Sequence, residues 1–575
     1  MKVSKIHIII MLAFMSLASS CNFLDKEPTS TTSGSYFKSE AEAETFLKGI
    51  YAPLTETSFY GNDYFFLVGG DDLEAYGGPG RSPSTRGLIC NNANSSDPAV
   101  TAFWYTLYVG VNRANIFLEE IDKVPELSTS SAKRLTAEAR FLRAFYYFNL
   151  VQCWGDVPLK TSSTQSVKGL QIARTPKAEI YDFKEMEESV DGLKKASEVG
   201  YLPGGLTKSA AWGILARVYM FRAGECYRDN TAPDETVRKE YFTKADTFAQ
   251  KVMHEGHTLA PNYWDYFIDQ CSDKYNTTGK ESIWEAEFTG NYSTDTRTEG
   301  RVGNIIGIQA PDLSSKIELK GKADPGFGYC FFWSTPKLYE LYEANSDKNR
   351  MNWSIAPFSY TQSKTGNGVD GRMFEKGKLQ EVKNQYYSKS YSYGDKPSTS
   401  KVGDREKATA STDYSRMCAK WRREYEPDKK NKNFTLVNFP ILRYADVLLM
   451  IAECENEIHG GPTALAYQCI NEVRKRAGIS SLSGLNQEKF RNAVKDERAM
   501  ELCFEMTRRF DLIRWGDFKK NMNELAARAK SGTNWNLGPS NVYTYFQVSD
   551  AYNYFPIPSN EMAINKKITA NNPGW

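Results

Sequence analysis

Apolar residues recur at helical spacing through most of the chain, and this periodicity constrains the fold more than any other feature. Within residues 131–155 the apolar side chains follow one another at steps of four, three, four and four: Leu135, Ala139, Leu142, Tyr146 and Leu150. That period is the signature of one face of an α-helix. Phe141, Phe145 and Phe148 line an adjacent face, which predicts a helix covered on more than one side.

The same pattern predicts a series of helices, several of them adjacent in sequence as pairs. They span residues 40–52, 103–122, 131–155, 176–197, 207–224, 238–256, 441–459, 462–477, 487–504 and 520–530. Small residues alternate with large ones around Ala210, Gly213 and Ala216, so helices can approach closely there, as in tetratricopeptide stacks. No clean repeat of about 34 residues is present. We therefore expect degenerate tetratricopeptide-like helix pairs.

Two regions interrupt the helices. Residues 60–98 and 290–435 are rich in Gly, Ser and Asn, which predicts long loops with, in the second region, a small sheet. Loops of this length in a compact fold tend to carry function. Residues 281–290 (ESIWEAEFTG) alternate like a short strand, and we expect Trp284 on it to be part of the core.

Bulk charge narrows the possible partners. The chain has 575 residues with a formal net charge of +2, from 72 basic and 70 acidic residues. A polyanion-binding protein normally carries a basic excess, so a nucleic-acid partner is not indicated.

The first residues predict export and lipid attachment. Lys2 and Lys5 precede the apolar run IIIMLAFMSLASS, and small residues then lead directly to Cys21. This is the pattern of a secretory signal peptide over residues 1–20. The junction resembles a bacterial lipoprotein box, although Leu17 lies one place further from the cysteine than is usual. We expect Cys21 to be lipidated, with residues 21–40 as a tether; plain secretion is the alternative.

The remaining cysteines and histidines indicate neither disulfides nor a metal. Nine cysteines follow Cys21 at irregular spacing without a C-x-x-C motif. His254 and His257 lie three apart, but no carboxylate has a matching offset, so no zinc site is expected. No nucleotide- or phosphate-binding motif occurs, and we expect no cofactor.

The stretch ERAMELCFEMTRRFDLIRWG, residues 497–516, concentrates charge. On one continuous helix, Glu501, Glu505 and Arg509 would form a stripe, with Glu505 and Arg509 as an ion pair. Asp511 and Arg514 would form another. We interpret the stretch as a brace between helices. The rival is a glycosidase pair made of Glu497 and Glu501, but neighbouring arginines would hold the pKa of both carboxyls down.

Several separated segments resemble one family. They are ARFLRAFYYFNLVQCWGDVPL, RYADVLLMIAECENEIHG, INEVRKRAG, the 497–516 stretch, YFPIPSNEM and NPGW. In this order they are similar to the SusD/RagB-like lipoproteins of Bacteroidetes. The resemblance implies a mainly α fold of degenerate tetratricopeptide-like helix pairs with a loop-rich, partly β ligand-binding region. It implies a helical region over 41–270 and a SusD/RagB region over 271–575, within one compact domain.

The resemblance also implies a function. Members lie on the outer membrane and bind nutrients, usually glycans, for a SusC-like TonB-dependent transporter. We expect a non-catalytic, glycan-binding lipoprotein that faces the cell exterior. A peptide-binding, RagB-like protein with the same transporter partner is the alternative. A carboxylate-dependent glycosidase is the third hypothesis.

Ligand residues are expected in the two loop-rich regions. Flat aromatic rings cover the apolar faces of sugars, and Asp, Asn and Arg bond the hydroxyls. The predicted ligand residues are Asp71, Asp72, Tyr76, Arg81, Asn92, Tyr292, Tyr329 and Trp333. Neighbours with the same chemistry are Asn91, Phe327, Phe332, Trp353 and Tyr360.

Overall fold

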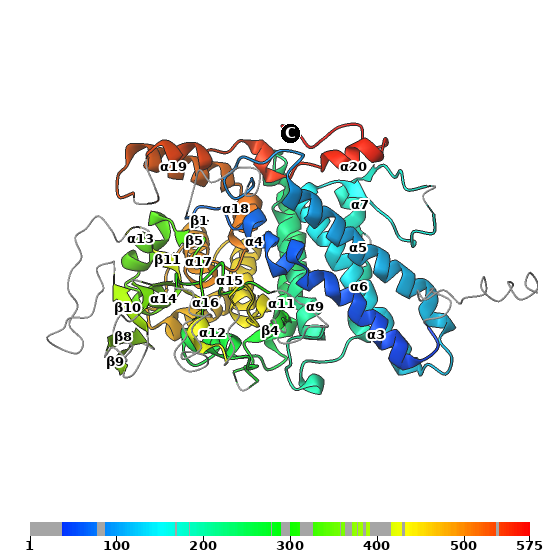
Figure 1. The fold of residues 1–575 in the computed structure, drawn as a ribbon, viewed down its shortest axis with the longest axis horizontal. Coiled ribbons are helices and arrows are strands. Elements are labelled where there is room, and N and C mark those ends of the chain that lie inside the picture. The colour runs from blue at the N-terminus through cyan, green and yellow to red at the C-terminus, as the bar shows by residue number, and fades with distance from the viewer. Residues whose placement is uncertain are drawn as a thin grey trace, which may run out of the picture.

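Helices make up most of the fold. The structure is a computed structural model that describes residues 37–77, 87–166, 169–182, 184–277, 279–288, 300–310, 326–356, 358–362, 371–375, 378–382, 387–391, 414, 416–427, 432–535, 537 and 540–575. Figure 1 shows two helical groups: α3, α5 and α6 on one side, and α15, α16 and α17 on the other, with α9 and α11 between them. The fold class predicted from the periodicity is confirmed.

The amino-terminal helices that the periodicity predicts are α3 (Glu40–Tyr51), α5 (Pro98–Glu120), α6 (Thr129–Trp154), α9 (Lys208–Ala223) and α11 (Glu235–Met253). The periodicity does not predict α4 (Asp63–Val68), α10 (Glu225–Arg228) and α12 (Tyr263–Cys271). Local sequence fixes their starts. Asp97 accepts hydrogen bonds from the backbone of Ala99 and Val100 at the start of α5, and Ser128 accepts one at the start of α6. Such caps satisfy amide groups that the first turn leaves unpaired.

The prediction of a single helix over residues 176–197 is wrong. The chain forms α7 (Lys177–Asp182), α8 (Glu185–Ser189) and two single turns, Val190–Gly192 and Ser197–Val199. Gly192 lies against α6, where a Cβ would come within 2.5 Å of the Cβ of Ala137. The segment therefore bends to follow the surface of α6 instead of continuing as a straight helix.

The carboxy-terminal half adds a second helical group. Its helices are α13 (Pro336–Ala344), α14 (Lys348–Ser354), α15 (Tyr444–His459), α16 (Ala464–Ala477), α17 (Gln487–Leu502), α18 (Arg508–Trp515), α19 (Phe518–Ser531) and α20 (Ser559–Ile564). The sequence analysis missed α13 and α14, which lie inside the region expected to be loop and sheet. It also missed α4 in the first loop-rich region. These helices are short, and a few turns give little periodicity to detect.

Short strands form a four-stranded sheet and several two-stranded ladders, and β1 (Glu74–Tyr76) is the strand that pairs across the two halves in the described residues. The four-stranded sheet has the order β1-β5-β11-β6, formed by β1 (Glu74–Tyr76), β5 (Phe332–Ser334), β11 (Met417–Cys418) and β6 (Ile355–Ala356). The other ladders are β2 (Val157–Pro158) with β3 (Arg174–Thr175), β4 (Ser282–Ala286) with β12 (Phe439–Arg443), β7 (Phe358–Gln362) with β10 (Tyr387–Tyr391), and β8 (Gly371–Glu375) with β9 (Lys378–Val382). The strand expected over 281–290 is thus confirmed as β4, and Trp284 on it is fully buried.

The last residues of the chain close the end of α6. The backbone amide of Phe555 donates to the carbonyl of Cys153 at 2.7 Å, and the side-chain amide of Asn572 donates to the carbonyl of Trp154 at 2.9 Å. Arg174 in turn donates to the Asn572 side chain at 2.5 Å. Carbonyls at a helix end have no partner within the helix, so the carboxy-terminal segment supplies one.

The 497–516 stretch is two helices, and the expectation of one continuous helix is wrong. α17 ends at Leu502 and α18 begins at Arg508. Between them Phe504 and Met506 have φ of 62° and 60°, the left-handed conformation that ends a helix. The break separates Glu505 from Arg509, so the pair expected between them does not form. Glu505 contacts Lys420 and Arg443 instead, and Arg509 donates to the carbonyl of Tyr552.

One buried ion-pair network surrounds the end of α17. Glu501, which is fully buried, accepts from Arg350 at 2.9 Å and from Arg443 at 2.6 Å, and it also pairs with Arg476. Glu497 forms ion pairs with Arg350 and Arg474 at 2.7 Å each. The network contains five acidic and five basic side chains: Glu281, Asp347, Glu497, Glu501, Glu505, Arg350, Lys420, Arg443, Arg474 and Arg476. It connects α14, α16 and α17 with Arg443, the last residue of β12, and Glu281, the residue before β4.

A second network includes Arg498 of α17. Arg498 pairs with Asp446 at 2.7 Å and with Asp511 at 2.8 Å, and Arg514 pairs with Asp511 at 2.8 Å. Glu453 and Arg217 extend it to α15 and α9. The interpretation of the charged stretch as a brace between helices is therefore confirmed, including the predicted pair of Asp511 with Arg514.

Candidate functional site

Four aromatic side chains alternate along one short segment beside the four-stranded sheet. We call Phe327, Tyr329, Phe331 and Trp333 the aromatic ledge. Tyr329 is 37% exposed, and the other three are half-buried. The rings of Tyr329 and Phe331 stack on each other, so these two residues share one side of the segment. The side chain of Phe332, between two ledge residues, is fully buried.

Backbone hydrogen bonds hold the ledge segment on both flanks. The amides of Tyr329 and Phe331 donate to the carbonyls of Asn304 and Ile305 at 2.8 and 3.0 Å. On the other flank the amide of Gly77 donates to the carbonyl of Phe331 at 2.8 Å. A segment bonded on both sides presents its rings without prior rearrangement, which lowers the entropic cost of binding.

The rings of the ledge form a stepped apolar surface. Tyr329 and Phe331 are parallel, with centroids 5.0 Å apart and an interplanar angle of 6°. Phe327 meets Tyr329 edge-on at 4.6 Å. Tyr76 packs behind Phe331 with centroids 5.8 Å apart, and it is only 4% exposed. Tyr76 therefore supports the ledge from inside rather than offering its own face to a ligand.

Cations border the ledge. The guanidinium of Arg301 lies 5.7 Å from the ring centroid of Tyr329, and the ammonium of Lys432 lies 5.3 Å from that of Phe327. Arg301 also donates to the side chain of Asn304 at 3.2 Å. Exposed rings beside polar donors are the arrangement that binds a ligand with apolar faces and hydroxyl edges.

Gly77 makes room for the indole of Trp333. A Cβ at residue 77 would lie 2.1 Å from Cδ1 and 2.2 Å from Nε1 of Trp333. The indole N–H donates to the carbonyl of Cys330 at 3.3 Å. Cys330 has a φ of 55°, so the backbone turns sharply at that point. The position of the indole is thus set by a small neighbour and one hydrogen bond.

The predicted ligand residues Asp71 and Asp72 have partners inside the fold. Asp71 is 1% exposed and accepts from the amides of Leu73 and Glu74. Asp72 is fully buried and accepts from Arg508 at 2.8 Å and from Lys337 at 2.6 Å. Burial, and then Asp72, raise the pKa of Asp71 to about 8. Burial alone would raise the pKa of Asp72, but Arg508 and Lys337 hold it below its usual value.

The other predicted residues divide between the ledge and elsewhere. Tyr329 and Trp333 belong to the ledge. Asn92 is exposed beside Asn91, whose side chain donates to the carbonyl of Tyr545. Within the described chain no contact joins Asn92 to the ledge. Arg81 and Tyr292 lie outside the described residues. Trp353 is buried, and Tyr360 lies on β7.

Phe331 is a ledge residue that the sequence analysis did not select. The segment FGYCFFW, residues 327–333, places an aromatic at every second position from Phe327 to Trp333. That period of two was the available signal, because it predicts rings on one side of an extended segment.

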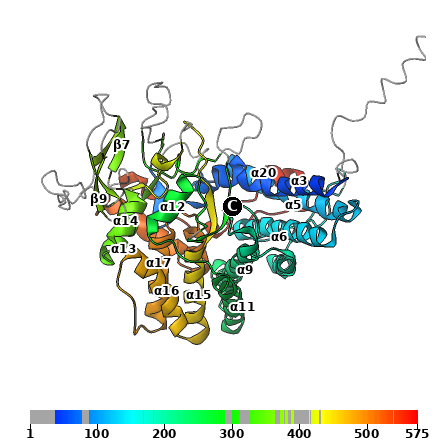
Figure 2. The same cartoon turned by 90° about the horizontal axis from the view of Figure 1, so that it is seen from below.

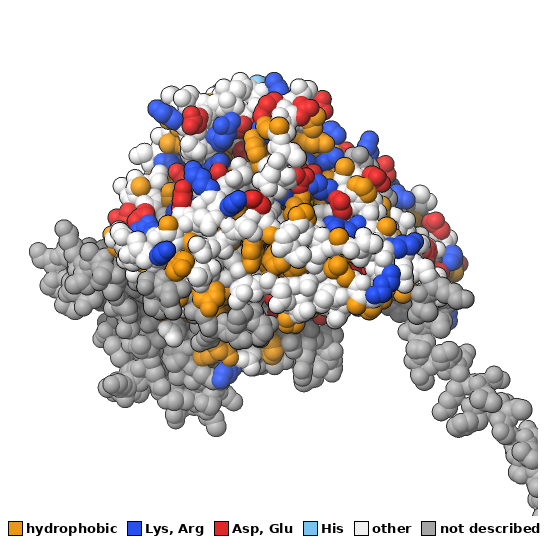
Figure 3. Space-filling model, turned by 90° about the horizontal axis from the view of Figure 1, so that it is seen from above, with side chains coloured by type: hydrophobic (Ala, Val, Ile, Leu, Met, Phe, Trp, Pro, Cys, Tyr) orange, Lys and Arg blue, Asp and Glu red, His pale blue; other side chains and the backbone are white. Residues whose placement is uncertain are grey.

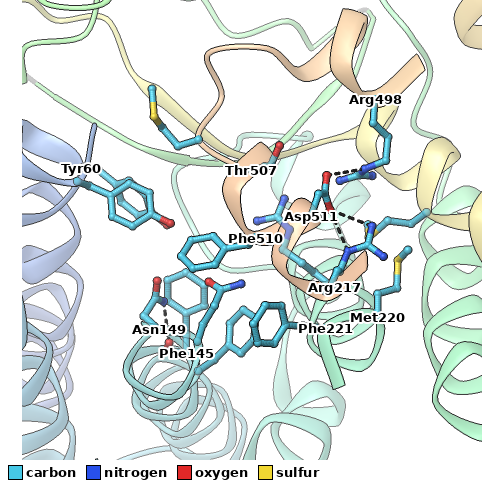
Figure 4. Close-up of a pocket in the computed structure, with 16 residues that line it drawn as sticks. Tyr60, Phe145, Asn149, Arg217, Met220, Phe221, Arg498, Thr507, Phe510 and Asp511 are labelled. Carbon is cyan, nitrogen blue, oxygen red and sulfur yellow. Dashed lines mark hydrogen bonds and ion pairs between the residues drawn. The ribbon is translucent and has the colours of Figure 1, made fainter. Parts of the chain in front are cut away.

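Two hollows elsewhere fit a ligand less well. The cavity in Figure 4 lies between α6, α9 and α18 and has about 50 Å³ of room for water-sized molecules, which is too little for a sugar ring. A groove of about 780 Å³ runs beside α11, α15, α17 and α18. Its cations Arg238, Arg491 and Lys495 already pair with Glu235, Glu457 and Asp517. It has the balanced charge of a solvated surface.

Two further features bear on the class of protein. Within the described part of the chain, no group of three or more His, Cys, Asp or Glu side chains is arranged to hold a metal ion. None of the helices in that part has both the length and the apolar character needed to cross a bilayer.

Comparison with known proteins gives consistent results at the level of sequence and fold. The family model described as "SusD family" matches residues 280–575, and the one described as "Starch-binding associating with outer membrane" matches residues 22–220. A SusD-like protein of Formosa agariphila is 25% identical over 98% of this chain and 97% of its own length. The starch-binding protein SusD of Bacteroides thetaiotaomicron is 23% identical over 96% of each chain. The crystal structure of a SusD homolog from Bacteroides thetaiotaomicron is 27% identical, with a TM-score of 0.78 over 96% of this chain and 100% of that chain.

Proposed function

The chain belongs to the SusD family of glycan-binding proteins, and from this premise we propose that it captures oligosaccharides on its aromatic ledge and delivers them to an outer-membrane transporter. The observation that carries the proposal is the parallel pair of Tyr329 and Phe331, of which Tyr329 is more than one-third exposed. A flat, partly exposed ring offers its face to the C–H side of a sugar. Arg301 and Lys432 at the border supply donors for hydroxyl groups.

Capture on this surface requires no covalent chemistry. The acids of the charged stretch, Glu497 and Glu501, are fully buried and paired with arginines. Burial alone would raise the pKa of Glu501, but Arg476, Arg443 and Arg350 together hold it below its usual value of 4.5. A glycosidase needs a reachable carboxyl with a raised pKa as its general acid. The arrangement of these two residues therefore supports a binding role.

Lipid attachment at Cys21 would keep the captured glycan near the transporter. Cys21 and the residues up to 36 lie outside the described residues, so this part of the proposal rests on the sequence pattern. A Cys21→Ser chain is expected to leave the membrane fraction while it keeps its glycan affinity. A chain that stays membrane-bound after this change would contradict lipid attachment without affecting the proposed binding surface.

The binding proposal is tested by calorimetry on the purified protein with oligosaccharides from the glycan that induces its operon. Tyr329→Ala is expected to weaken binding about five- to thirtyfold, since stacking on one ring contributes on the order of 1–2 kcal/mol. Tyr275→Ala is the matched control, because Tyr275 is 44% exposed and lies outside the ledge. Equal losses in both variants would remove the ledge as the site.

The same experiment separates the alternatives. Binding to a peptide array without binding to any oligosaccharide would favour a peptide-binding, RagB-like protein. Release of shorter products during incubation with polysaccharide would establish a glycosidase. Absence of binding to both ligand classes would reject capture altogether.

A further inference from the structure

The contiguous rings of the aromatic ledge need a support that keeps them in place. On the face with α19 and α20, Figure 3 shows hydrophobic groups among charges of both signs, as is normal for a protein surface. Phe327, Tyr329 and Phe331 instead follow one another in contact, with centroids 4.6 and 5.0 Å apart. Because Tyr329 is exposed, core packing alone does not fix this row of rings.

Asn304 bonds to both rings and both cations of the proposed binding surface. It is fully buried, and its side-chain amide donates to the carbonyl of Phe327 at 3.1 Å and to that of Lys432 at 2.9 Å. Its side-chain oxygen accepts from the guanidinium of Arg301 at 3.2 Å. Its backbone carbonyl accepts from the amide of Tyr329 at 2.8 Å. One buried residue therefore connects the stacking surface with the polar groups at its border.

The partners of this side chain fix the orientation of its amide. The carbonyls of Phe327 and Lys432 only accept hydrogen bonds, and the guanidinium of Arg301 only donates them. A reversed amide would place its oxygen against two other oxygens and its nitrogen against a cation. The nitrogen of Asn304 therefore faces the two carbonyls, and both of its N–H groups are used.

Asn304 is itself held in a tight turn that does not depend on the ledge. The amides of Asn304 and Ile305 donate to the carbonyl of Arg301 at 3.1 and 3.0 Å. Gly303, inside the turn, has a φ of 77°, which residues with a Cβ rarely adopt. The amide of Arg301 donates to the carbonyl of Gly61 at 3.1 Å, which attaches the turn to the chain just before α4. The turn is therefore fixed independently, and the ledge is positioned against it.

We infer that Asn304 is the positioning residue of the proposed binding surface and fixes the ring of Tyr329 relative to the guanidinium of Arg301. These two groups lie 5.7 Å apart, so one sugar can stack on the ring and bond the guanidinium at once. The inference rests on the proposed glycan capture and adds to it a residue that acts through others. A surface whose groups are already in place loses less conformational freedom on binding. Asn304 has no exposed surface and contacts no ligand itself.

Asn115 provides a matched control, because its amide makes the same set of bonds in another part of the fold. It is fully buried, donates to the carbonyls of Lys160 and Ser162 at 3.1 and 3.0 Å, and accepts from Arg143 at 2.5 Å. Figure 2 shows α5, which carries Asn115, at one end of the molecule and α13, which follows β5 directly, towards the other. A substitution that only destabilises the fold is therefore expected to act alike at both asparagines.

The test is a double-mutant cycle, measured by calorimetry with the oligosaccharides of the inducing glycan. Asn304→Ser is expected to weaken binding about tenfold in the unaltered chain but only about twofold in the Tyr329→Ala chain, because it acts mainly through that ring. Asn115→Ser is expected to leave the affinity unchanged in both. Hydrogen exchange over residues 327–333 is expected to become faster in Asn304→Ser and to stay unchanged in Asn115→Ser. Asn304→Asp, which keeps the acceptor for Arg301 but loses both donors, is a second variant with the same expected result.

The outcomes separate this inference from the proposed function. Unchanged affinity in both variants of Asn304 overturns the positioning role and leaves glycan capture intact. Equal losses in Asn304→Ser and Asn115→Ser, or the same loss with and without the ring of Tyr329, mean general destabilisation and also overturn it. Failure of the unaltered protein to bind any oligosaccharide overturns the proposed function, and this inference with it.

Discussion

Gly77 shows how one residue controls the shape of the ledge. It lies so close to the indole of Trp333 that any larger side chain must displace the ring. Its φ lies outside the left-handed region, so Ala is compatible with the backbone. The effect of a substitution there is therefore steric and local.

We expect Gly77→Ala to weaken oligosaccharide binding about three- to tenfold and to shift the fluorescence of Trp333. Calorimetry and emission spectra measure the two effects. Gly461→Ala is the control, because nothing lies within 4 Å of a Cβ there. Unchanged affinity in Gly77→Ala would mean that the ligand does not contact Trp333.

Burial brings the pKa of Asp71 close to neutral pH. Its pKa is raised from 3.8 to about 8 by burial and by Asp72, so the folded protein holds the proton that the unfolded chain releases. The sign follows from linkage. The stability contribution is complete below pH 3.8 and is lost as the pH rises to about 8.

Asp71→Asn is expected to raise the melting temperature at pH 7–8 and to flatten its decline between pH 4 and 8. The amide oxygen can still accept from Leu73 and Glu74, as the carboxyl does now. Thermal melts across this pH range measure the effect, with the exposed Asp122→Asn as control. A lower melting temperature for Asp71→Asn at pH 8 would contradict the assignment of a buried, protonated carboxyl.

At the scale of elements, the buried networks hold the helices around α17 in register. Glu501 has no exposed surface and forms ion pairs with three arginines. Its pKa is held below 4.5, so its contribution to stability is present above pH 4.5 and is lost as the pH falls. Removing one charge from such a network leaves the others buried without compensation.

Glu501→Gln is expected to lower the free energy of unfolding by about 3–5 kcal/mol. Glu343→Gln removes a carboxylate from an exposed ion pair with Lys348. This change is expected to alter the free energy of unfolding by no more than about 1 kcal/mol. Urea denaturation at pH 7 compares the two variants. Equal losses of the free energy of unfolding in Glu501→Gln and Glu343→Gln would mean that water reaches Glu501.

The helices were largely predictable from sequence, and their interruptions were not. α6 and α9 form within one or two residues of the predicted bounds, because a long apolar period depends only on local spacing. The break after Leu502 has no Gly or Pro to signal it. It arises because Glu505 turns toward Lys420 and Arg443, which lie far away in sequence. Such partners are set by the tertiary fold and leave no local pattern.

The candidate site was predictable only in part, for a similar reason. The aromatic residues of the second loop-rich region led to the prediction of Tyr329 and Trp333 as ligand residues. In the structure Tyr329 is exposed and Trp333 is half-buried. Asp71 and Asp72 have the same chemistry as ligand residues, but burial and Arg508 engage them inside the fold. Sequence identifies the type of side chain, whereas burial decides whether a ligand can reach it.

At the scale of the whole molecule, the two matched family segments form one connected body. Arg508 pairs with Asp72, the indole of Trp154 donates to the carbonyl of Pro556, and Asn572 bonds the end of α6. Residues from both segments line a single hydrophobic core. We therefore expect the described fold to unfold as one unit.

Calorimetry is expected to record a single transition, and Asn572→Ala is expected to lower its temperature without splitting it. The lost bonds to Trp154 and Phe555 cost on the order of 1–3 kcal/mol. Lys566→Ala, at an exposed position, is expected to have no effect. Two separate transitions, or a variant that loses only one of them, would mean that the halves fold independently.

The contact of the carboxy-terminal segment with the end of α6 also affects the order in which the fold is completed during synthesis. A ribosome completes α6 some 400 positions before it reaches Asn572, whose amide meets the carbonyl of Trp154. Until Asn572 has been synthesised, the carbonyl of Trp154 lacks this partner at the end of α6. The far end of α6 is thus closed only after the carboxy-terminal segment has been synthesised.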